Sequence, residues 1–436
     1  AEVTLDPSTP LVLELRCGTG NVDAAPIPEP LRSEQTQQHW KQWASGLTLP
    51  TVATEACRRS ALVLKGLCHG PTGGIAAAAT TSLPEHCGGI RNWDYRYCWV
   101  RDGAMTAEAL ATLGSLTEGM QFLDWALGVI DRTGSPDQLR PVYTLAGEEL
   151  GTEAEIAELT GYAGSRPVRV GNAASRQVQL DVFGPLIQLI DVLVERGAPL
   201  SSEHWRLVSS LVDTVSRRWR EPDHGIWEVR GPRRHFVHSK VMCWAAVDRG
   251  IRIASRLAGE TREDWIALRD EIAEDVVTHG WKPEVHSFVA AYDGTDLDAS
   301  TLFVGLTGLL PADDPRFRDT VDTVDRYLRD GPTVYRYRFE DGLPGTEGGF
   351  HICTTWLIRS LLLIGETRRA RELFDAFSAL GGPTGLFPEE WDEREQRSLG
   401  NHPQAYTHLG LIECAWAFAA LEGNGQTTTN SVQDVV

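Results

Sequence analysis

The sequence lacks the short motifs of several common enzyme classes and is poor in basic residues. It contains no H-E-x-x-H zinc motif and no G-x-x-x-x-G-K-[ST] phosphate loop. Its 60 acidic residues outnumber 41 basic ones, which leaves a formal net charge of −19. Nucleic acids and anionic membranes attract basic surfaces, and no run approaches the roughly 18 apolar residues of a membrane span. We therefore expect neither nucleic acid nor membrane as a partner.

Cysteine spacing of a disulfide or zinc framework is also missing. The eight cysteines include no C-x-x-C pair, and several lie in apolar runs such as Val241–Trp244. This pattern favours buried free thiols in a reducing compartment, so we expect a cytoplasmic protein. His235 and His238 are three residues apart but have no third ligand at usable spacing. The sequence thus predicts no metal and no cofactor.

The two ends of the chain differ from its middle. Alternation over residues 10–16 predicts a single strand, and the prolines of residues 24–30 predict an extended linker. A lone strand leaves its edges unpaired, so we expect it to pair elsewhere. The polar residues 422–436 predict a disordered tail. We therefore divide the chain into residues 1–33, a body over residues 34–421, and this tail.

The body has a mainly helical pattern. Apolar side chains recur at helical spacing from Phe183 to Val194, and Gly197 ends the run. Similar patterns predict helices over 51–68, 103–113, 116–132, 201–219, 236–258, 261–279, 315–328, 349–364, 367–380 and 402–421, with further helices within 34–46 and 295–309. The predicted fold class is all-α, with antiparallel helical pairs. Six such hairpins closed into a ring would form an (α/α)6 toroid.

Residues 91–102 concentrate aromatic and charged side chains between two predicted helices. Tyr95, Tyr97 and Trp99 alternate, so in an extended segment they would share one face, either in a binding pocket or in the core. Asp102 suits the N-cap of a helix that begins near Gly103. Together with Arg101 it also suits a clamp on vicinal hydroxyl groups. Aromatic faces beside charged hydrogen-bonding groups are typical of a sugar site.

Two glutamates add acid–base chemistry to such a site. Glu228 follows a turn and Trp227, where burial beside an indole would raise its pKa and keep it protonated as a general acid. A surface loop position is the ordinary alternative for any single glutamate. Glu389 and Glu390 are adjacent, so one should face away from the site, and Asp392 is a further candidate. Two carboxyl groups in an aromatic pocket predict a glycoside hydrolase.

Lys240 follows Ser239, a pair that could form a nucleophilic dyad. The surrounding sequence instead favours a helix start, from which Lys240 reaches back to the pocket.

Six groups of motifs, in order along residues 35–421, resemble glycoside hydrolase family 15, the family of glucoamylases and of bacterial and archaeal trehalases and glucodextranases. They are Pro71–Gly74 with Thr80–Glu85, Arg91–Asp102, Gly161–Arg169 with Gly171–Asn172, Gly225–Glu228 with His238–Met242, Asp341–Gly345 with Glu347–Gly348, and Leu399–Asn401 with Pro403–Ala405.

The resemblance implies an (α/α)6 toroid, an inverting mechanism and no cofactor. Glu228 matches the family's general acid and Glu389 its general base. Arg101 and Asp102 match the pair that holds the nonreducing glucose. The remaining expected pocket residues are Tyr95, Trp99, Arg166, Trp227, Lys240, Arg336 and Tyr406; Arg338 lies close to Arg336 and competes for its role.

The sequence also departs from the family. Bacterial members carry a β-sandwich domain before the toroid, and residues 1–33 resemble only its last strand and linker. Pro388 replaces a serine that usually precedes the base, and Val229 stands where fungal glucoamylases have a second acid. That second difference indicates a distinct site beyond the first sugar.

The predicted substrate is a small-molecule or oligosaccharide α-glucoside. The motifs favour trehalose hydrolysis over a glucoamylase, a glucodextranase or another α-glucosidase. The alternatives of other kinds are a catalytically silent carbohydrate-binding homologue and a phosphorolytic enzyme. A homo-oligomer is compatible with the sequence.

Overall fold

The computed structural model describes residues 3–4, 8, 11–15 and 28–424, which form two compact units divided between Leu47 and Thr48. In the first unit, helix α1 (Glu29–Ser45) has no buried residue. Residues 11–15 have no regular structure, so the predicted strand over 10–16 is wrong within these residues. A single extended segment gains no ladder hydrogen bonds without a neighbour. Most of the predicted linker and tail lies outside the described residues.

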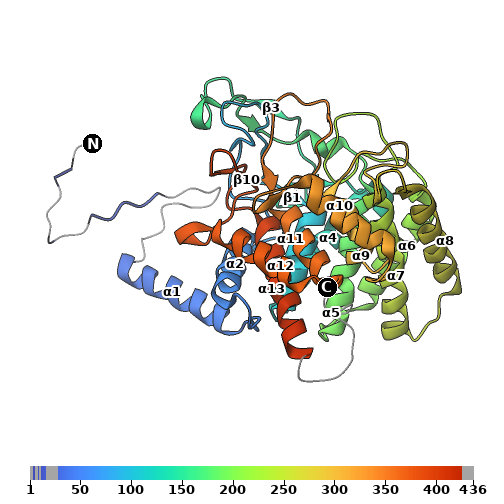
Figure 1. Ribbon diagram of the computed structural model, residues 1–436. Coiled ribbons are helices and arrows are strands. Elements are labelled where there is room, and N and C mark those ends of the chain that lie inside the picture. Colours follow the sequence, from blue (N-terminus) through green and yellow to red (C-terminus); the bar gives the residue numbers. More distant parts are fainter. Residues whose placement is uncertain (1–2, 5–7, 9–10, 16–27, 425–436) are drawn as a thin grey trace. The chain divides into compact units, whose positions relative to one another are not determined.

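Helices are the main elements of the second unit (Figure 1). They are α2 (Thr54–Leu67), α3 (Val100–Thr112), α4 (Leu116–Thr133), α5 (Phe183–Glu195), α6 (Ser202–Arg218), α7 (Val237–Ile253), α8 (Glu263–Gly280), α9 (Phe303–Leu306), α10 (Pro315–Leu328), α11 (His351–Leu363), α12 (Thr367–Ala379) and α13 (Ala405–Asn424). The predicted helices are therefore confirmed, apart from shifted ends. The helix expected within 295–309 is shorter: a 3-10 turn over Ala299–Leu302 leads into α9.

These helices form two concentric rings. The inner ring runs α3, α5, α7, α9, α11 and α13, and α13 packs back on α3 to close it. Each inner helix follows an outer helix in sequence, as α4 precedes α5 and α12 precedes α13. The chain thus makes six consecutive hairpins. This is the arrangement that the helical pattern predicted.

Side-chain patterning separates the two rings. Inner helix α11 is buried along nearly its whole length, which suits a helix surrounded by neighbours. Outer helix α10 buries one face through Phe317, Val321, Val324 and Leu328 and exposes charged residues on the other. None of the described helices is both long and apolar enough to span a membrane. The described cysteines are free, and most are buried.

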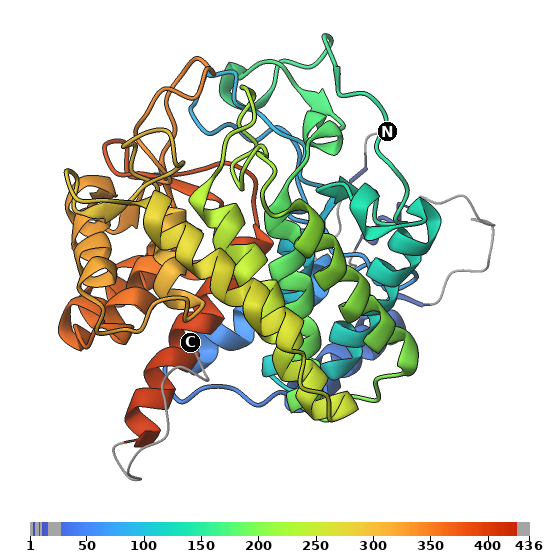
Figure 2. The same cartoon turned by 90° about the vertical axis from the view of Figure 1, so that its right-hand side faces the viewer.

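The inner helices begin at one end of the ring, where the long loops and short strands gather (Figures 1 and 2). The largest sheet has the antiparallel order β11-β10-β9-β8-β7. Its strands are β7 (Arg329–Asp330), β8 (Thr333–Val334), β9 (Gly349–Phe350), β10 (Glu390–Asp392) and β11 (Arg397–Leu399). Two-stranded pairs are β1 (Cys98–Trp99) with β2 (Val142–Tyr143), β3 (Ala154–Glu155) with β4 (Arg169–Val170), and β5 (Trp281–Lys282) with β6 (Ser287–Phe288). The segments that precede the inner helices therefore meet at this end.

Candidate active site

A pocket opens where the inner helices begin, and it gathers most of the predicted site. Its lining includes Tyr95, Trp99, Arg101, Asp102, Trp227, Glu228, Arg336, Glu389 and Tyr406. These residues are far apart in sequence, but each lies in the segment that leads into an inner helix or in the first turn of that helix. The closed ring of hairpins is what brings them together.

Glu228 reaches the pocket from the loop before α7. Its backbone is left-handed, with φ 60°, a conformation that costs a residue with a side chain roughly 1 kcal/mol and that recurs at functional sites. Trp99 Nε1 donates to Glu228 Oε1 at 2.5 Å, and Gln177 Nε2 donates to the Glu228 carbonyl at 3.0 Å. Burial raises the pKa of Glu228, while Arg101 and the Trp99 hydrogen bond oppose that rise. Its environment favours a carboxyl group that can hold a proton.

Glu389 lies directly before β10, far from Glu228 in the sequence, and is 3% exposed. Its Oε1 accepts from the Tyr95 hydroxyl at 2.7 Å and from Gln404 Nε2 at 3.3 Å, whereas Oε2 has no partner. Burial raises the pKa of Glu389, and the neighbouring Glu85 adds to the rise. The Tyr95 hydrogen bond and the charge of Arg336 partly offset this rise, because both favour the ionised carboxylate.

Tyr95 and Trp99 connect the two glutamates. Their rings meet edge to face with centroids 5.4 Å apart, and each donates to a different carboxylate. Tyr97 does not join them in the pocket lining, because a bend at residues 96–97 interrupts the predicted alternation. Trp99 and Tyr97 also pack in one hydrophobic cluster with Val142. The aromatic segment is therefore part of both the pocket wall and the core.

Arg101 and Asp102 lie side by side at the base of α3. Arg101 Nε donates to Asp102 Oδ1 at 3.0 Å, and Arg101 Nη1 donates to Asp181 Oδ2 at 3.1 Å. Asp102 is the third residue of a helix whose N-cap is Trp99, so its predicted N-cap position is wrong by three residues. The helix starts earlier because the β1 strand ends directly against it. A buried guanidinium braced by two carboxylates presents fixed donors to a ligand hydroxyl.

Trp227 and Arg336 form another wall. Trp227 Nε1 donates to both carboxylate oxygens of Asp298, at 2.9 and 3.0 Å. Arg336 pairs with Glu347, and its guanidinium lies 5.7 Å from the Trp227 ring centroid. Arg338 instead stacks on Tyr335 at 4.3 Å and is exposed. The structure thus distinguishes the two candidate arginines and brings only Arg336 into the lining.

Two predicted residues are not part of this pocket. Arg166 is exposed and does not line it. Lys240 is buried, but its ammonium group donates to the carbonyls of Trp219 and Glu221. The expectation that Lys240 reaches back to the pocket is wrong, because these carbonyls at the start of the α6–α7 connection hold its ammonium group, and Lys240 is not part of the pocket lining.

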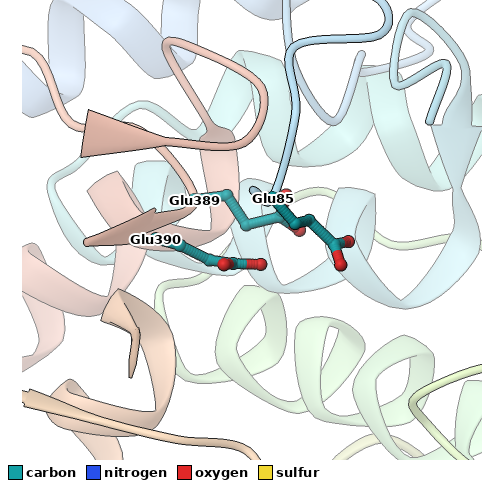
Figure 3. Close-up of side chains that lie close together, drawn as sticks. All are labelled: Glu85, Glu389 and Glu390. Carbon is teal, nitrogen blue, oxygen red and sulfur yellow. The ribbon is translucent and has the colours of Figure 1, made fainter. Parts of the chain in front are cut away.

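Several lining residues were missed from the sequence. They are Glu85, Trp93, Asn172, Gln177, Asp341, Phe350 and Gln404. Most belong to motifs already noted, so the motif signal was present, but spacing alone does not show which side chain of a loop turns inward. Glu85 is the most consequential, because its carboxyl group lies close to those of Glu389 and Glu390 (Figure 3).

The closed ring of helical hairpins, with aromatic rings, arginines and separate carboxyl groups at one end, defines a carbohydrate-active protein of the helical-toroid class. More narrowly, the chain belongs to the family described as glycosyl hydrolases family 15, whose profile matches residues 51–416. A bacterial glucoamylase complexed with acarbose is similar in fold, with a TM-score of 0.68 and 14% identity over 90% of this chain and 59% of that one. The predicted (α/α)6 fold is confirmed.

Two curated relatives show higher sequence similarity. A trehalase of Thermoplasma acidophilum is 40% identical over 388 residues, which cover 88% of this chain and 66% of that protein. A trehalase of Mycobacterium tuberculosis is 42% identical over 384 residues, covering 87% of this chain and 56% of that protein. The chain thus spans 66% of the length of the first relative and 56% of the length of the second.

Proposed function

We propose that this protein hydrolyses an α-glucosidic bond with inversion and that its substrate is α,α-trehalose. The observation that carries the proposal is the pair Glu228 and Glu389 in one aromatic pocket, each with its own hydrogen-bond donor. The family and the similarity to trehalases support the substrate.

The two carboxyl groups divide the reaction between them. Protonated Glu228 gives its proton to the glycosidic oxygen as the bond to the anomeric carbon breaks. Glu389, as a carboxylate, takes a proton from the water that attacks the same carbon from the opposite face. An inverting pair needs the carboxyl groups about 6.5–9.5 Å apart to leave room for that water. We expect this separation for Glu228 and Glu389, and a crystal structure with a bound sugar would measure it.

The rest of the pocket suits a glucose unit. Arg101 and Asp102 would bind vicinal hydroxyl groups at its closed end, and Tyr95, Trp99 and Trp227 would cover the apolar faces of the ring. Tyr406 lies beside Arg101, with the guanidinium 5.9 Å from its ring centroid. The second glucose of trehalose would occupy the rim.

The test is glucose release from trehalose, maltose, soluble starch and dextran by the wild type, Glu228→Gln and Glu389→Gln. We expect turnover of trehalose and a loss of about 10²–10⁴-fold in kcat in either variant. Glu395→Gln, an exposed acid in the β10–β11 hairpin, is the matched control. Turnover of maltose or starch without trehalose would instead assign a glucoamylase-type activity.

Stereochemistry tests the mechanism separately. Inversion of α,α-trehalose gives one β-glucose from the attacked unit and one α-glucose from the leaving unit, which proton NMR distinguishes before mutarotation. Two α-glucose molecules would contradict inversion. Thermal stabilisation by glucose or an aza-sugar without turnover of any substrate would identify a silent binding protein.

A further inference from the structure

Three glutamate side chains converge at the wall of the pocket, two of them in its lining. Glu85 comes from the loop after α2, Glu390 is the first residue of β10, and Glu389 directly precedes it (Figure 3). One carboxylate oxygen of each lies within 4.8 Å of the others, and none of the three is more than 3% exposed. We call these three residues the carboxyl cluster. Three negative charges so close together in a buried site would repel one another strongly.

Hydrogen bonding does not satisfy the carboxyl cluster. Glu85 accepts from Trp93 Nε1 at 2.7 Å, and Glu390 accepts from the Gly348 amide at 2.6 Å. Each of the three residues nevertheless has one buried oxygen with no hydrogen-bond partner: Glu85 Oε2, Glu389 Oε2 and Glu390 Oε1. A fully ionised buried carboxylate with an unpaired oxygen carries a large desolvation penalty. A proton retained within the cluster removes that penalty.

The neighbouring arginines are engaged elsewhere. Arg336 lies 3.9 Å from Glu85 but pairs with Glu347 at 2.6 Å. Arg91 lies 4.0 Å from Glu85 but pairs with Asp341 at 2.8 Å and with Glu347 at 3.0 Å. The two arginines are thus shared among five carboxyl groups: the three of the carboxyl cluster, Glu347 and Asp341. The short ion pairs go to Glu347 and Asp341, outside the cluster. The carboxyl cluster lacks the positive charge needed to ionise completely.

Within the cluster, Glu389 and Glu390 have different surroundings. Glu389 lines the pocket and accepts from two side-chain donors, whereas Glu390 does not line it, is 0% exposed and accepts from one amide. We propose that Glu390 retains a proton at neutral pH and, as a neutral hydrogen-bond donor, allows Glu389 to be the ionised member. Glu390 is then a positioning residue for the general base. This inference rests on the proposed role of Glu389.

The electrostatic surroundings support this assignment. Burial raises the pKa of Glu390 well above its ordinary range, and that of Glu85 to about 7. Glu390 also interacts electrostatically with four other titratable or charged groups: Glu347, Arg336, Cys353 and Tyr335. Of these, Arg336 favours ionisation of Glu390 but is paired with Glu347. The proton therefore belongs on the most buried carboxyl group.

Infrared spectroscopy tests the proposal without relying on turnover. Wild-type protein with ¹³C-carboxyl-labelled glutamate should show at pH 7, beside the bands of other protonated glutamates such as Glu228, a protonated-carboxyl C=O component that Glu390→Gln loses. Glu85→Gln is the matched control and should keep that component. Loss of the component in Glu85→Gln but not in Glu390→Gln would overturn the proposal, as would a wild-type spectrum that Glu390→Gln leaves unchanged in this region. Because this readout needs no substrate, it separates failure of this inference from failure of the proposed function.

The pH profile of kcat/KM tests the direction in which each substitution of Glu390 shifts the pKa of Glu389. Glu390→Gln keeps a neutral donor, so the acidic limb, which reports ionisation of Glu389, should stay in place. Glu390→Met removes the donor, so the pKa of Glu389 should rise and the acidic limb should move up by about half to one pH unit. If Glu390 were ionised and repelled Glu389, both variants would move that limb to lower pH. Such a downward shift in either variant would overturn the proposal.

Discussion

The hydroxyl of Tyr95 donates to Oε1 of Glu389 across 2.7 Å, and this bond orients the carboxyl group of the proposed base. Four residues further along the chain, Trp99 makes the equivalent bond to Glu228. One short segment before α3 therefore holds both proposed catalytic carboxylates. Its position sets the distance between them, and substitutions there should act on the two ionisations separately.

We first expect Tyr95→Phe to weaken the base. Loss of the hydroxyl removes a donor that favours the Glu389 carboxylate, so its pKa should rise and the acidic limb of kcat/KM should move to higher pH. A hydrogen bond to a charged group contributes about 1.5–3 kcal/mol, so kcat should fall roughly 10- to 100-fold at acidic pH. The measurement is a pH–rate profile with trehalose.

Tyr97→Phe is the control for this substitution. Tyr97 lies two residues away in the same segment and packs against the same hydrophobic cluster, but it does not line the pocket. Its profile should match the wild type. An unchanged acidic limb in Tyr95→Phe would show that the hydrogen bond does not tune Glu389.

A second expectation concerns the acid. Trp99→Phe keeps an aromatic ring but removes the indole donor that favours the Glu228 carboxylate, so the pKa of Glu228 should rise. Because the acid must be protonated to act, the basic limb of kcat/KM should move to higher pH by roughly one unit. Tyr95→Phe should leave that limb in place. A downward shift of the basic limb would contradict the proposed role of Glu228.

The fold could be predicted because the helical period is strong and local. The runs from α2 to α13 carry apolar stripes that the hairpins bury, and their order alone leads to paired helices. Ring closure could not be read from those stripes, since it depends on α13 packing against α3, nearly three hundred residues away. The strand expected at residues 10–16 is wrong within the described residues 11–15 for a related reason. Strand formation requires a partner, and local alternation does not supply one.

Pocket residues could be predicted where their local sequence pattern is unusual. Glu228 and Glu389 each follow a turn that contains aromatic residues. Arg101 and Asp102 form a charged pair at the end of an aromatic run. The start of the helix that carries Lys240 was predicted correctly. The expected direction of its side chain was wrong, because carbonyls about twenty residues earlier in the chain hold the ammonium group. Glu85 was missed because nothing local marks a carboxyl group that becomes buried beside two others.

A third expectation concerns stability and pH. Asp223 is fully buried and accepts from Ser239 Oγ and the Leu180 amide, and burial raises its pKa from 3.8 to about 7. Between those values the native state keeps a proton that the unfolded chain releases, so the free energy of unfolding should fall as pH rises. Asp223→Asn removes this contribution. The free energy of unfolding of the wild type should decrease between pH 4 and pH 8. The decrease in Asp223→Asn should be smaller than the wild-type decrease by on the order of 2–4 kcal/mol.

Urea unfolding at several pH values measures this difference. Asp213→Asn, which changes an exposed acid on α6, should follow the wild-type pH dependence. If the free energy of unfolding depends on pH in the same way in Asp223→Asn and the wild type, Asp223 is ionised in the native state over the whole range from pH 4 to pH 8.

A fourth expectation comes from Gly400, which lies directly against the proposed base. A Cβ at this position would be 2.6 Å from Glu389 Oε2 and 2.7 Å from Glu389 Cβ, and the backbone has φ +74°. Gly400→Ala should therefore cost about 1–2 kcal/mol in stability for the left-handed backbone and displace Glu389 as well. A displaced base should lower kcat by about 10²-fold or more.

Gly365→Ala separates these two effects. Gly365 has a similar φ of +84°, but an added Cβ there meets no atom within 4 Å. Both variants should lose comparable stability in thermal unfolding, whereas only Gly400→Ala should lose activity. Equal activity in the two variants would show that the Glu389 side chain tolerates displacement at this point. Loss confined to Gly400→Ala would mean that the close contact between Gly400 and Glu389 is needed to hold the base in its reactive position.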